Sequence, residues 1–278
     1  MIIDSHHHFW EFNKEDYRWI DDSMSILRRD FLPPHLEDQL QEADVSGTVV
    51  VQARQNLDET RWLLELAGEY DFIRGVVGWV DLRSEEIENQ INELADNPKL
   101  VGVRHVVQDE PDDDFMLRAD FIRGIEKLKS YNLAYDLLLF PKHLSRAAEL
   151  VSMFPEQKFV LDHISKPLIK SGILDPWRAD LEHLAARPNI WCKISGLVTE
   201  ADTENWKYEN FIPYLDVVVD AFGTNRLMIG SDWPVCLLAG EYSEILDIPQ
   251  RYFKKFSAIE RVKIMSSNCI DFYDLPIQ

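Results

Sequence analysis

The sequence predicts a (β/α)8 barrel, and three observations lead to that prediction. Short β-branched runs alternate with amphipathic segments from one end of the chain to the other. Several runs are apolar almost throughout, such as Thr-Val-Val-Val at 48–51, which is typical of parallel strands buried on both faces. The alternation fits eight strand–helix repeats into 278 residues, and this barrel usually takes about 250. An open doubly wound sheet is the alternative.

The expected strands end where apolar runs give way to polar residues. They cover residues 2–9, 48–52, 73–80, 100–107, 133–140, 158–164, 190–195 and 226–232. The expected helices lie between and after them, at residues 34–43, 59–70, 87–94, 119–131, 142–154, 210–222 and 258–266, with one more starting at Asp175-Pro176. Ile87, Ile91 and Leu94 fall on one helical face. Asp175-Pro176 is a cap residue followed by a proline at the first helical position.

The chain is predicted to form a single domain over residues 1–278, because no Gly/Ser-rich linker or low-complexity tract divides it. No Gly-x-Gly-x-x-Gly motif follows the first strand, which weakens a dinucleotide-binding alternative. Residues 10–34 are rich in aromatic and charged side chains. A loop of this length after the first strand can cover a site at the barrel mouth.

Charge and cysteine usage exclude several kinds of partner. The formal net charge is −20, and no basic run interleaves with aromatic residues, so nucleic acid is not an expected partner. Strong acidity argues against anionic membranes, and the sequence shows no basic leader and no apolar stretch of about 18 residues. Cys192, Cys236 and Cys269 lie far apart, which suits free thiols in a reducing compartment. A cytoplasmic protein is therefore expected.

Polar and ionisable residues recur at the carboxyl ends of the predicted strands, where barrels of this class carry their active sites. They are His6 with His8, Gln52 with Arg54, Arg104 with His105, Asp162 with His163, Lys193 with Ser195, and Asp232. Any single one is compatible with a solvated loop residue. Their coincidence at the same end of nearly every strand predicts a shared site.

The first and last predicted strands carry side chains that can bind a metal ion or transfer a proton. His6 and His8 are two residues apart, so both imidazoles face the same side of the strand. Imidazole pairs suit zinc and similar ions, and a third histidine with one carboxylate completes a mononuclear site. His163 is the candidate third ligand, with a structural histidine as the alternative. Asp232 can bind a cation, take a proton from water, or do both in sequence.

Further residues are expected around the same pocket, where cationic groups in an otherwise acidic protein would polarise a carbonyl and hold a product carboxylate. The expected catalytic residues are Asp232, His105 and Arg104. The expected substrate contacts are Gln52, Lys166, Lys193 and Trp233. Surface ion pairs are the alternative for each of the cationic side chains.

Five motifs, in order along the whole chain, resemble the amidohydrolase superfamily. They are Asp4-x-His6-x-His8-Phe9-Trp10, Gly102-Val103-Arg104-His105, Leu161-Asp162-His163-x-x-Lys166-Pro167, Lys193-x-Ser195-Gly196 and Gly230-Ser231-Asp232-Trp233-Pro234. More narrowly they resemble its lactonase branch, and the tract Gln108-Asp109-Glu110-Pro111 looks closest to sugar-acid lactonases such as L-fuconolactonase and L-rhamnonolactonase. The resemblance implies a TIM-type barrel and hydrolysis by an activated water.

The resemblance implies one divalent metal, zinc being the first choice, held by His6, His8, His163 and Asp232. Two metals are not expected, because strand five ends without the usual histidine, and strand four offers Arg104-His105 where a bridging lysine belongs. Similar members of the branch work without a metal, so the ion can be dispensable and the same groups would then orient water and substrate.

The expected reaction is the opening of an aldonic-acid lactone, of L-fuconolactone type. Asp232 would serve as general base on water and then as acid toward the departing ring oxygen. The alternatives are a metal-dependent decarboxylase of an aromatic or muconate-type acid, a pyrone or muconolactone hydrolase, and a non-catalytic sugar-binding barrel. The expected partner is the small-molecule lactone, and a homodimer is the alternative to a monomer.

Overall fold

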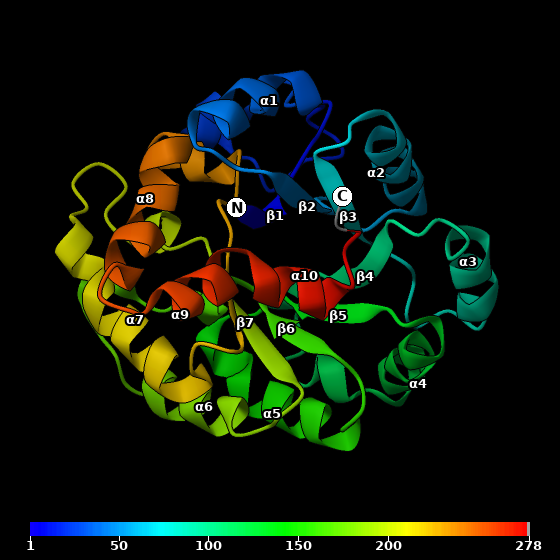
Figure 1. Cartoon of the computed structure of the whole chain (residues 1–278). Coiled ribbons are helices and arrows are strands. Elements are labelled where there is room, and N and C mark those ends of the chain that lie inside the picture. Colours follow the sequence, from blue (N-terminus) through cyan, green and yellow to red (C-terminus); the bar gives the residue numbers. More distant parts are fainter. Residues whose placement is uncertain (277–278) are drawn as a thin grey trace.

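The computed structural model describes residues 1–276 and contains a parallel sheet of eight strands that follow one another in chain order. The strands are β1 (Ile3–His7), β2 (Gly47–Val51), β3 (Ile73–Gly78), β4 (Leu100–His105), β5 (Ala134–Leu137), β6 (Phe159–Leu161), β7 (Ile190–Ile194) and β8 (Leu227–Ile229). The predicted (β/α)8 barrel is confirmed (Figure 1).

Helices connect the strands and cover their outer side. They are α1 (Pro33–Glu42), α2 (Leu57–Glu69), α3 (Ile87–Leu94), α4 (Ala119–Leu128), α5 (Leu144–Met153), α6 (Trp177–Ala185), α7 (Tyr208–Phe222), α8 (Tyr242–Phe253), α9 (Ala258–Val262) and α10 (Asn268–Tyr273). Figure 1 shows α1 to α8 as a ring outside the strands, with α9 and α10 running across one end of the barrel. Within residues 1–276, every helix is too short or too polar to cross a bilayer.

Several strands end earlier than the sequence predicts. β6 stops at Leu161, and the following residues from His163 to Lys166 have left-handed backbone. β8 stops at Ile229, and Asp232 has a φ of 59°. The polar residues expected at these strand ends therefore lie in tight turns just beyond the sheet.

Three helical predictions also need correction. α8 is not predicted by the sequence pattern, and Pro249 inside it is a residue that usually interrupts a helix. The segment predicted as one helix at 258–266 is α9 followed by a π-helical stretch, Lys263–Ser267, and the chain then continues as α10. Pro176 is the N-cap of α6 and not its first residue.

The barrel closes between β1 and β8 through backbone contacts at their carboxyl ends. His7 forms a parallel bridge with Trp233. The Asp232 N–H donates to the His6 carbonyl at 2.8 Å, and the His8 N–H donates to the Trp233 carbonyl at 2.6 Å. The first and last strands are therefore neighbours, as the predicted meeting of their side chains requires.

The buried Asp4 carboxylate reinforces this seam. It accepts hydrogen bonds from the Ser231 N–H at 2.9 Å and from the Ser231 hydroxyl at 2.6 Å. The hydroxyl of Tyr242, on α8, donates to the same carboxylate at 3.0 Å. Asp4 thus ties β1 to the residue that directly precedes Asp232.

An apolar cluster fills the inside of the barrel and is completed by α10. Its members are Ile3, Val49, Val51, Val77, Val101, Ala134, Val160, Met228, Cys269, Phe272, Tyr273 and Leu275, which we call the interior apolar cluster. Lys158, just before β6, donates to the Phe272 carbonyl at 2.9 Å, which fixes α10 at the amino ends of the strands. α10 therefore closes the end of the barrel opposite the site (Figure 1).

The predicted long loop between β1 and α1 covers the other end. Trp10 is fully buried, and its ring lies edge-on to that of Phe31 at 5.4 Å between centroids. Phe31 in turn packs edge-on against Trp233 at 5.2 Å. These contacts anchor both ends of the loop, and its middle lines the cavity described next through Glu15, Asp16, Trp19 and Met24.

Candidate active site

A cavity of about 670 Å3 opens at the carboxyl ends of the strands, beneath the β1–α1 loop. His8, Arg104, His163, Lys166 and Asp232 are among the residues that line it. These are five of the residues that the sequence predicts for the site. The cavity is large enough for a small sugar derivative, since ligand pockets usually measure about 300–1,000 Å3.

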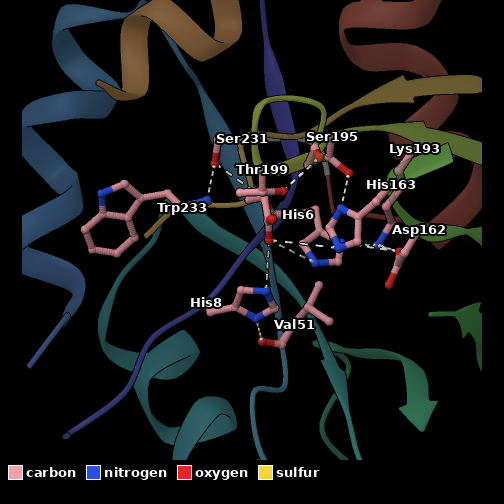
Figure 2. A network of polar contacts seen from close by, with 12 residues as sticks. His6, His8, Val51, Asp162, His163, Lys193, Ser195, Thr199, Ser231 and Trp233 are labelled. Carbon is pink, nitrogen blue, oxygen red and sulfur yellow. Dashed lines mark hydrogen bonds and ion pairs between the residues drawn. The ribbon is translucent and has the colours of Figure 1, made fainter. Parts of the chain in front are cut away.

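Three imidazoles converge on the Asp232 carboxylate: His8 and His163 line the cavity, and His6 is fully buried. The Oδ1 atom of Asp232 lies 3.3 Å from Nε2 of His8, 3.8 Å from Nε2 of His6 and 4.0 Å from Nε2 of His163. Figure 2 shows His6, His8 and His163 gathered from their separate chain segments. All four side chains are at least nine-tenths buried. The structure thus brings together the four residues that the resemblance implies as metal ligands.

The orientation of His8 indicates what belongs between it and Asp232. Nδ1 of His8 lies 2.7 Å from the Val51 carbonyl, which can only accept, so Nδ1 carries the proton. Nε2 then points its lone pair at the Asp232 carboxylate. Two acceptors at 3.3 Å need a proton or a cation between them. A histidine held by a carbonyl on one nitrogen and free on the other is the usual arrangement at metal sites.

The electrostatics of the site favour neutral imidazoles beside an ionised carboxylate. Burial lowers the pKa of His163 to about 4, and it holds the pKa of His6 well below its ordinary value. Burial opposes ionisation of Asp232, but the neighbouring His163, His8 and His6 outweigh it and keep the pKa of this carboxyl below its ordinary value. Neutral imidazole and ionised carboxylate are the forms that bind metals. His6, His8 and Asp232 can place ligand atoms within 4.8 Å of one another, so this donor set fits a divalent ion.

An unusual backbone turn brings His163 and Lys166 to the same cavity. Residues 163 to 166 all have positive φ, at 55°, 47°, 61° and 51°. Left-handed backbone costs roughly 1–2 kcal/mol for each residue other than glycine, and it is worst for a β-branched residue such as Ile164. The Trp177 indole holds the turn by donating to the Ile164 carbonyl at 2.8 Å. Strain of this kind, held by surrounding structure, is typical of functional sites.

The same turn fixes the His163 ring against β7. Nδ1 of His163 lies 2.9 Å from the Ser195 hydroxyl, and Figure 2 marks this contact with a dashed line. Gly196 makes room for the ring, because a Cβ at this position would lie 2.6 Å from Nδ1. Nε2 of His163 is therefore left facing Asp232.

Arg104 reaches the cavity from a cluster of buried charges. Its Nη1 atom lies 3.2 Å from Nε2 of His6 and 3.1 Å from Oδ2 of Asp162, and its Nη2 atom donates to the Gln52 carbonyl and side chain. Gln52 is fully buried and also donates to the Arg104 carbonyl at 3.3 Å. Gln52 therefore holds Arg104 in place and does not reach the cavity as a substrate contact.

His105 points away from the site, which corrects its expected catalytic role. Neighbouring residues of a strand alternate sides, so with Arg104 facing the barrel interior His105 faces outward. Its ring stacks on Phe115 at 4.9 Å, and its Nε2 lies 2.7 Å from a carboxylate oxygen of Glu110. The Trp79 indole donates to its other nitrogen at 3.4 Å. His105 thus fastens the loop after β4 from outside.

Two more expected substrate contacts lie too deep to touch a ligand. Lys193 is fully buried and pairs with Asp136 and Asp162 below the cavity. Trp233 is 3% exposed and packs its ring among aromatic side chains of the β1–α1 loop. Neither residue lines the cavity. Lys166, by contrast, is at the cavity wall as expected, with its Nζ 5.6 Å from the centre of the Phe140 ring.

Several lining residues come from loops that strand-end reasoning does not reach. They include Trp19, Gln108, Thr199 and Glu200, whereas Arg54, which is expected at a strand end, also lines the cavity. Burial raises the pKa of the Glu200 carboxyl, against the pull of the nearby Lys166. Arg54 is held by Asp16 at 2.6 Å across the cavity mouth. No periodic pattern marks such residues, because their position depends on how each loop folds.

A (β/α)8 barrel with histidines at the end of β1 and after β6, and an aspartate after β8, defines a hydrolase-type site built for an activated water. The model of the amidohydrolase family matches residues 3–275. The chain belongs to that family.

Three known proteins extend the comparison. A protein of Burkholderia multivorans named L-fucono-1,5-lactonase is 40% identical over 287 residues, covering 99% of this chain and 97% of the relative. A crystal structure of an amidohydrolase from Burkholderia multivorans with bound zinc has a TM-score of 0.96 at 40% identity, covering 99% of this chain and 100% of that chain. A manganese-bound dihydroxybenzoic acid decarboxylase from Polaromonas sp. JS666 has a TM-score of 0.66 at 14% identity over 98% and 96% of the chains, which shows the fold alone.

Proposed function

We propose that the protein hydrolyses the lactone ring of an aldonic acid, of L-fuconolactone type. The observation that carries this proposal is the convergence of His6, His8 and His163 on Asp232, which lines a cavity of about 670 Å3. The 40% identical relative with the lactonase name supports the choice of substrate. The decarboxylase alternative has only similarity of fold behind it.

One divalent ion, with zinc as the first choice, would be held by His6, His8, His163 and Asp232. The buried donor set and the zinc in the 40% identical relative support this assignment. When bound, such an ion polarises a carbonyl or lowers the pKa of a water. Arg104 competes for the same nitrogen of His6, at 3.2 Å, so a cationic partner is present there in either case. The ion is therefore proposed as dispensable.

In the proposed reaction Asp232 takes a proton from the attacking water, whose oxygen forms a bond to the lactone carbonyl carbon. The bond from that carbon to the ring oxygen then breaks, and Asp232 returns the proton to the ring oxygen as it becomes a hydroxyl. The carboxylic acid product ionises and releases one proton to solvent. A carboxylate in this position contributes typically 10²–10⁴-fold as a proton-transfer group.

The cationic residues would act on the carbonyl oxygen. Arg104 and Lys166 line the same cavity as Asp232 and carry donors that can stabilise the negative charge that develops there. His163 would orient the water through its Nε2, since its Nδ1 is engaged by Ser195. These roles are proposals on the geometry of the cavity.

A pH-stat assay over a panel of aldonolactones, with and without a chelator, tests the proposed function. Ring opening releases a proton for each turnover, whereas decarboxylation releases carbon dioxide and consumes one. We expect proton release with at least one aldonolactone, and zinc content measured on the same sample assigns the role of the metal. Binding without turnover, together with unchanged binding by Asp232→Ala, would favour the sugar-binding alternative.

A cytoplasmic location is also proposed. The three cysteines are free and buried, which suits a reducing compartment. A homodimer stays a prediction, and light scattering of the purified chain tests it.

A further inference from the structure

Beneath the cavity lie four buried charged side chains whose formal charges cancel. They are Arg104, Asp136, Asp162 and Lys193, which we call the interior charged cluster. Lys193 Nζ lies 2.5 Å from Oδ2 of Asp136 and 3.1 Å from Oδ1 of Asp162. Arg104 pairs with the other oxygen of Asp162 at 3.1 Å. Barrel interiors are usually packed with branched apolar side chains, so the presence of four charged side chains here needs a physical explanation.

A contribution to folding stability is a weak explanation for these buried charges. Buried ion pairs are often no more stabilising than apolar side chains of similar volume, because each charge loses its hydration. Their better documented contribution is to fix one arrangement among several. The cluster adjoins His6, whose imidazole is fully buried, and Figure 2 shows Asp162 and Lys193 of the cluster beside it.

The two nitrogens of His6 meet different surroundings. Nε2 faces Arg104 at 3.2 Å, so this nitrogen must accept, and a proton on it would meet another donor. Nδ1 lies 3.3 Å from Oδ1 of Asp162 and 3.2 Å from Nζ of Lys193. A neutral imidazole accepts at only one nitrogen, so one of these two neighbours decides which nitrogen carries the proton.

Asp162 is the neighbour that can take a proton from Nδ1. Its Oδ1 is buried and lies 3.1 Å from the Lys193 ammonium, but within the described residues it accepts no well-aligned hydrogen bond, so it can accept one from Nδ1. The carboxylate of Asp136 cannot accept this hydrogen bond from His6. It is occupied by Lys193 on one side and by the Tyr273 hydroxyl, at 2.9 and 2.8 Å, on the other. Asp162 does not line the cavity, so it acts through His6.

We propose that Asp162 is a positioning residue that keeps the proton of His6 on Nδ1 and thereby leaves Nε2, 3.8 Å from Asp232, to accept from Arg104 or to bind a metal ion. Lys193 and Arg104 hold the two oxygens of Asp162 in place for this purpose. A carboxylate behind a metal-binding or catalytic histidine fixes its tautomer and ring orientation, and removing such a partner typically costs 10–100-fold in metal affinity or activity. The inference deepens the proposed function and rests on it for the catalytic use of Nε2.

Two charge-balanced double variants test the proposal. Asp162→Asn alone would leave one buried positive charge in excess, so it is combined with Lys193→Met. The matched control, Asp136→Asn with Lys193→Met, also removes one negative and one positive charge but keeps Asp162 beside His6. The two proteins therefore share the loss of Lys193 and differ in the carboxylate that they retain.

The direct readout is the tautomer of His6 in the metal-free proteins, from nitrogen-15 chemical shifts of labelled imidazoles. We expect a proton on Nδ1 in the wild type and in the control, and a shift toward Nε2 in the Asp162 variant. We expect Zn2+ affinity, measured against a competing chelator, to fall about 10–100-fold in the Asp162 variant and less than about threefold in the control. On an aldonolactone, kcat should fall more than KM rises.

Retention of the Nδ1 proton and of wild-type Zn2+ affinity in the Asp162 variant would overturn the inference. Equal changes in both double variants would also overturn it, because Lys193 would then be the group that matters. A wild-type protein that opens no aldonolactone, but whose tautomer follows the expected pattern, contradicts the proposed function and supports the inference.

Discussion

The interior apolar cluster and the interior charged cluster share the same strands, yet they have opposite chemistry. On β5, Ala134 belongs to the apolar cluster, and Asp136, two residues later, belongs to the charged one. At β6 the same step leads from Val160, in the strand, to Asp162, the residue directly after it. Because side chains two apart share one face of a strand, both members of each pair face the barrel interior. In each pair the residue nearer the amino end packs in the apolar core, and the residue two positions later belongs to the charges that support the site.

This difference teaches that the role of an inward-pointing residue depends on its position along the strand, and not only on the side of the sheet to which it points. Substitutions at the amino ends of the strands should change stability and spare turnover. Substitutions at the carboxyl ends should change turnover more than stability. The first of the following three predictions tests that division directly, and the other two examine residues that support the carboxyl-end loops.

Leu275→Ala should lower the free energy of unfolding by about 2–5 kcal/mol, because Leu275 is buried in the interior apolar cluster and a cavity would remain. The kcat of the folded protein should stay within about twofold of wild type, since the site lies at the other end of the barrel. Urea unfolding and an aldonolactone assay check the two parts. A large loss of kcat with unchanged stability would contradict the claim that the interior apolar cluster serves stability and not turnover.

Glu59→Gln should change how stability depends on pH. Glu59 supports the loop after β2 by accepting from the N–H groups of Ala53 and Arg54 at 3.0 and 2.7 Å. Burial raises the pKa of Glu59 to about 7. A raised pKa means that the folded protein binds the proton more tightly, so the wild type loses stability as pH rises from about 4.5 through 7.

The amide side chain that replaces Glu59 does not titrate, so the variant should gain about 3 kcal/mol on the wild type between pH 4.5 and pH 8. Urea unfolding of both proteins at several pH values measures this difference. A difference that stays constant over the range would show that Glu59 is not held protonated by its surroundings.

Trp177→Phe should weaken the left-handed turn at residues 163 to 166, because it removes the hydrogen bond to the Ile164 carbonyl. We expect a loss of about 1 kcal/mol in the free energy of unfolding and of a few-fold in kcat/KM. Trp62→Phe, at a partly buried tryptophan of α2 away from the site, is the matched control. Equal effects of the two substitutions would mean that the turn does not depend on Trp177.

Much of the fold is predictable from the sequence, because parallel strands buried on both faces leave apolar runs that a single chain displays. The pair His6 and His8 follows from the strand period, and Asp232 from its place after the last run. Strand closure then brings the three together, as the hydrogen bond from Asp232 to the His6 carbonyl shows. α8 escapes prediction because Pro249 masks its pattern, and the plugging role of α10 depends on packing that no local pattern records.

The errors at the site have two physical sources. His105 follows Arg104 directly, so the alternation of side chains sends it outward, although its position along the chain matches the site. Lys193 faces inward but lies below the cavity, and only the three-dimensional depth of β7 reveals this. Loop residues such as Glu200 are set by the shape of their loops, which the sequence does not determine locally.

The turnover of Asp232→Asn on an aldonolactone at neutral pH tests the central claim most directly. The substitution keeps the shape of the side chain and removes its ability to accept the proton of water. If Asp232 is the proton-transfer group beside the three imidazoles, kcat should fall by about 10²–10⁴-fold while the protein stays folded. Near-normal turnover by the folded variant would contradict the account.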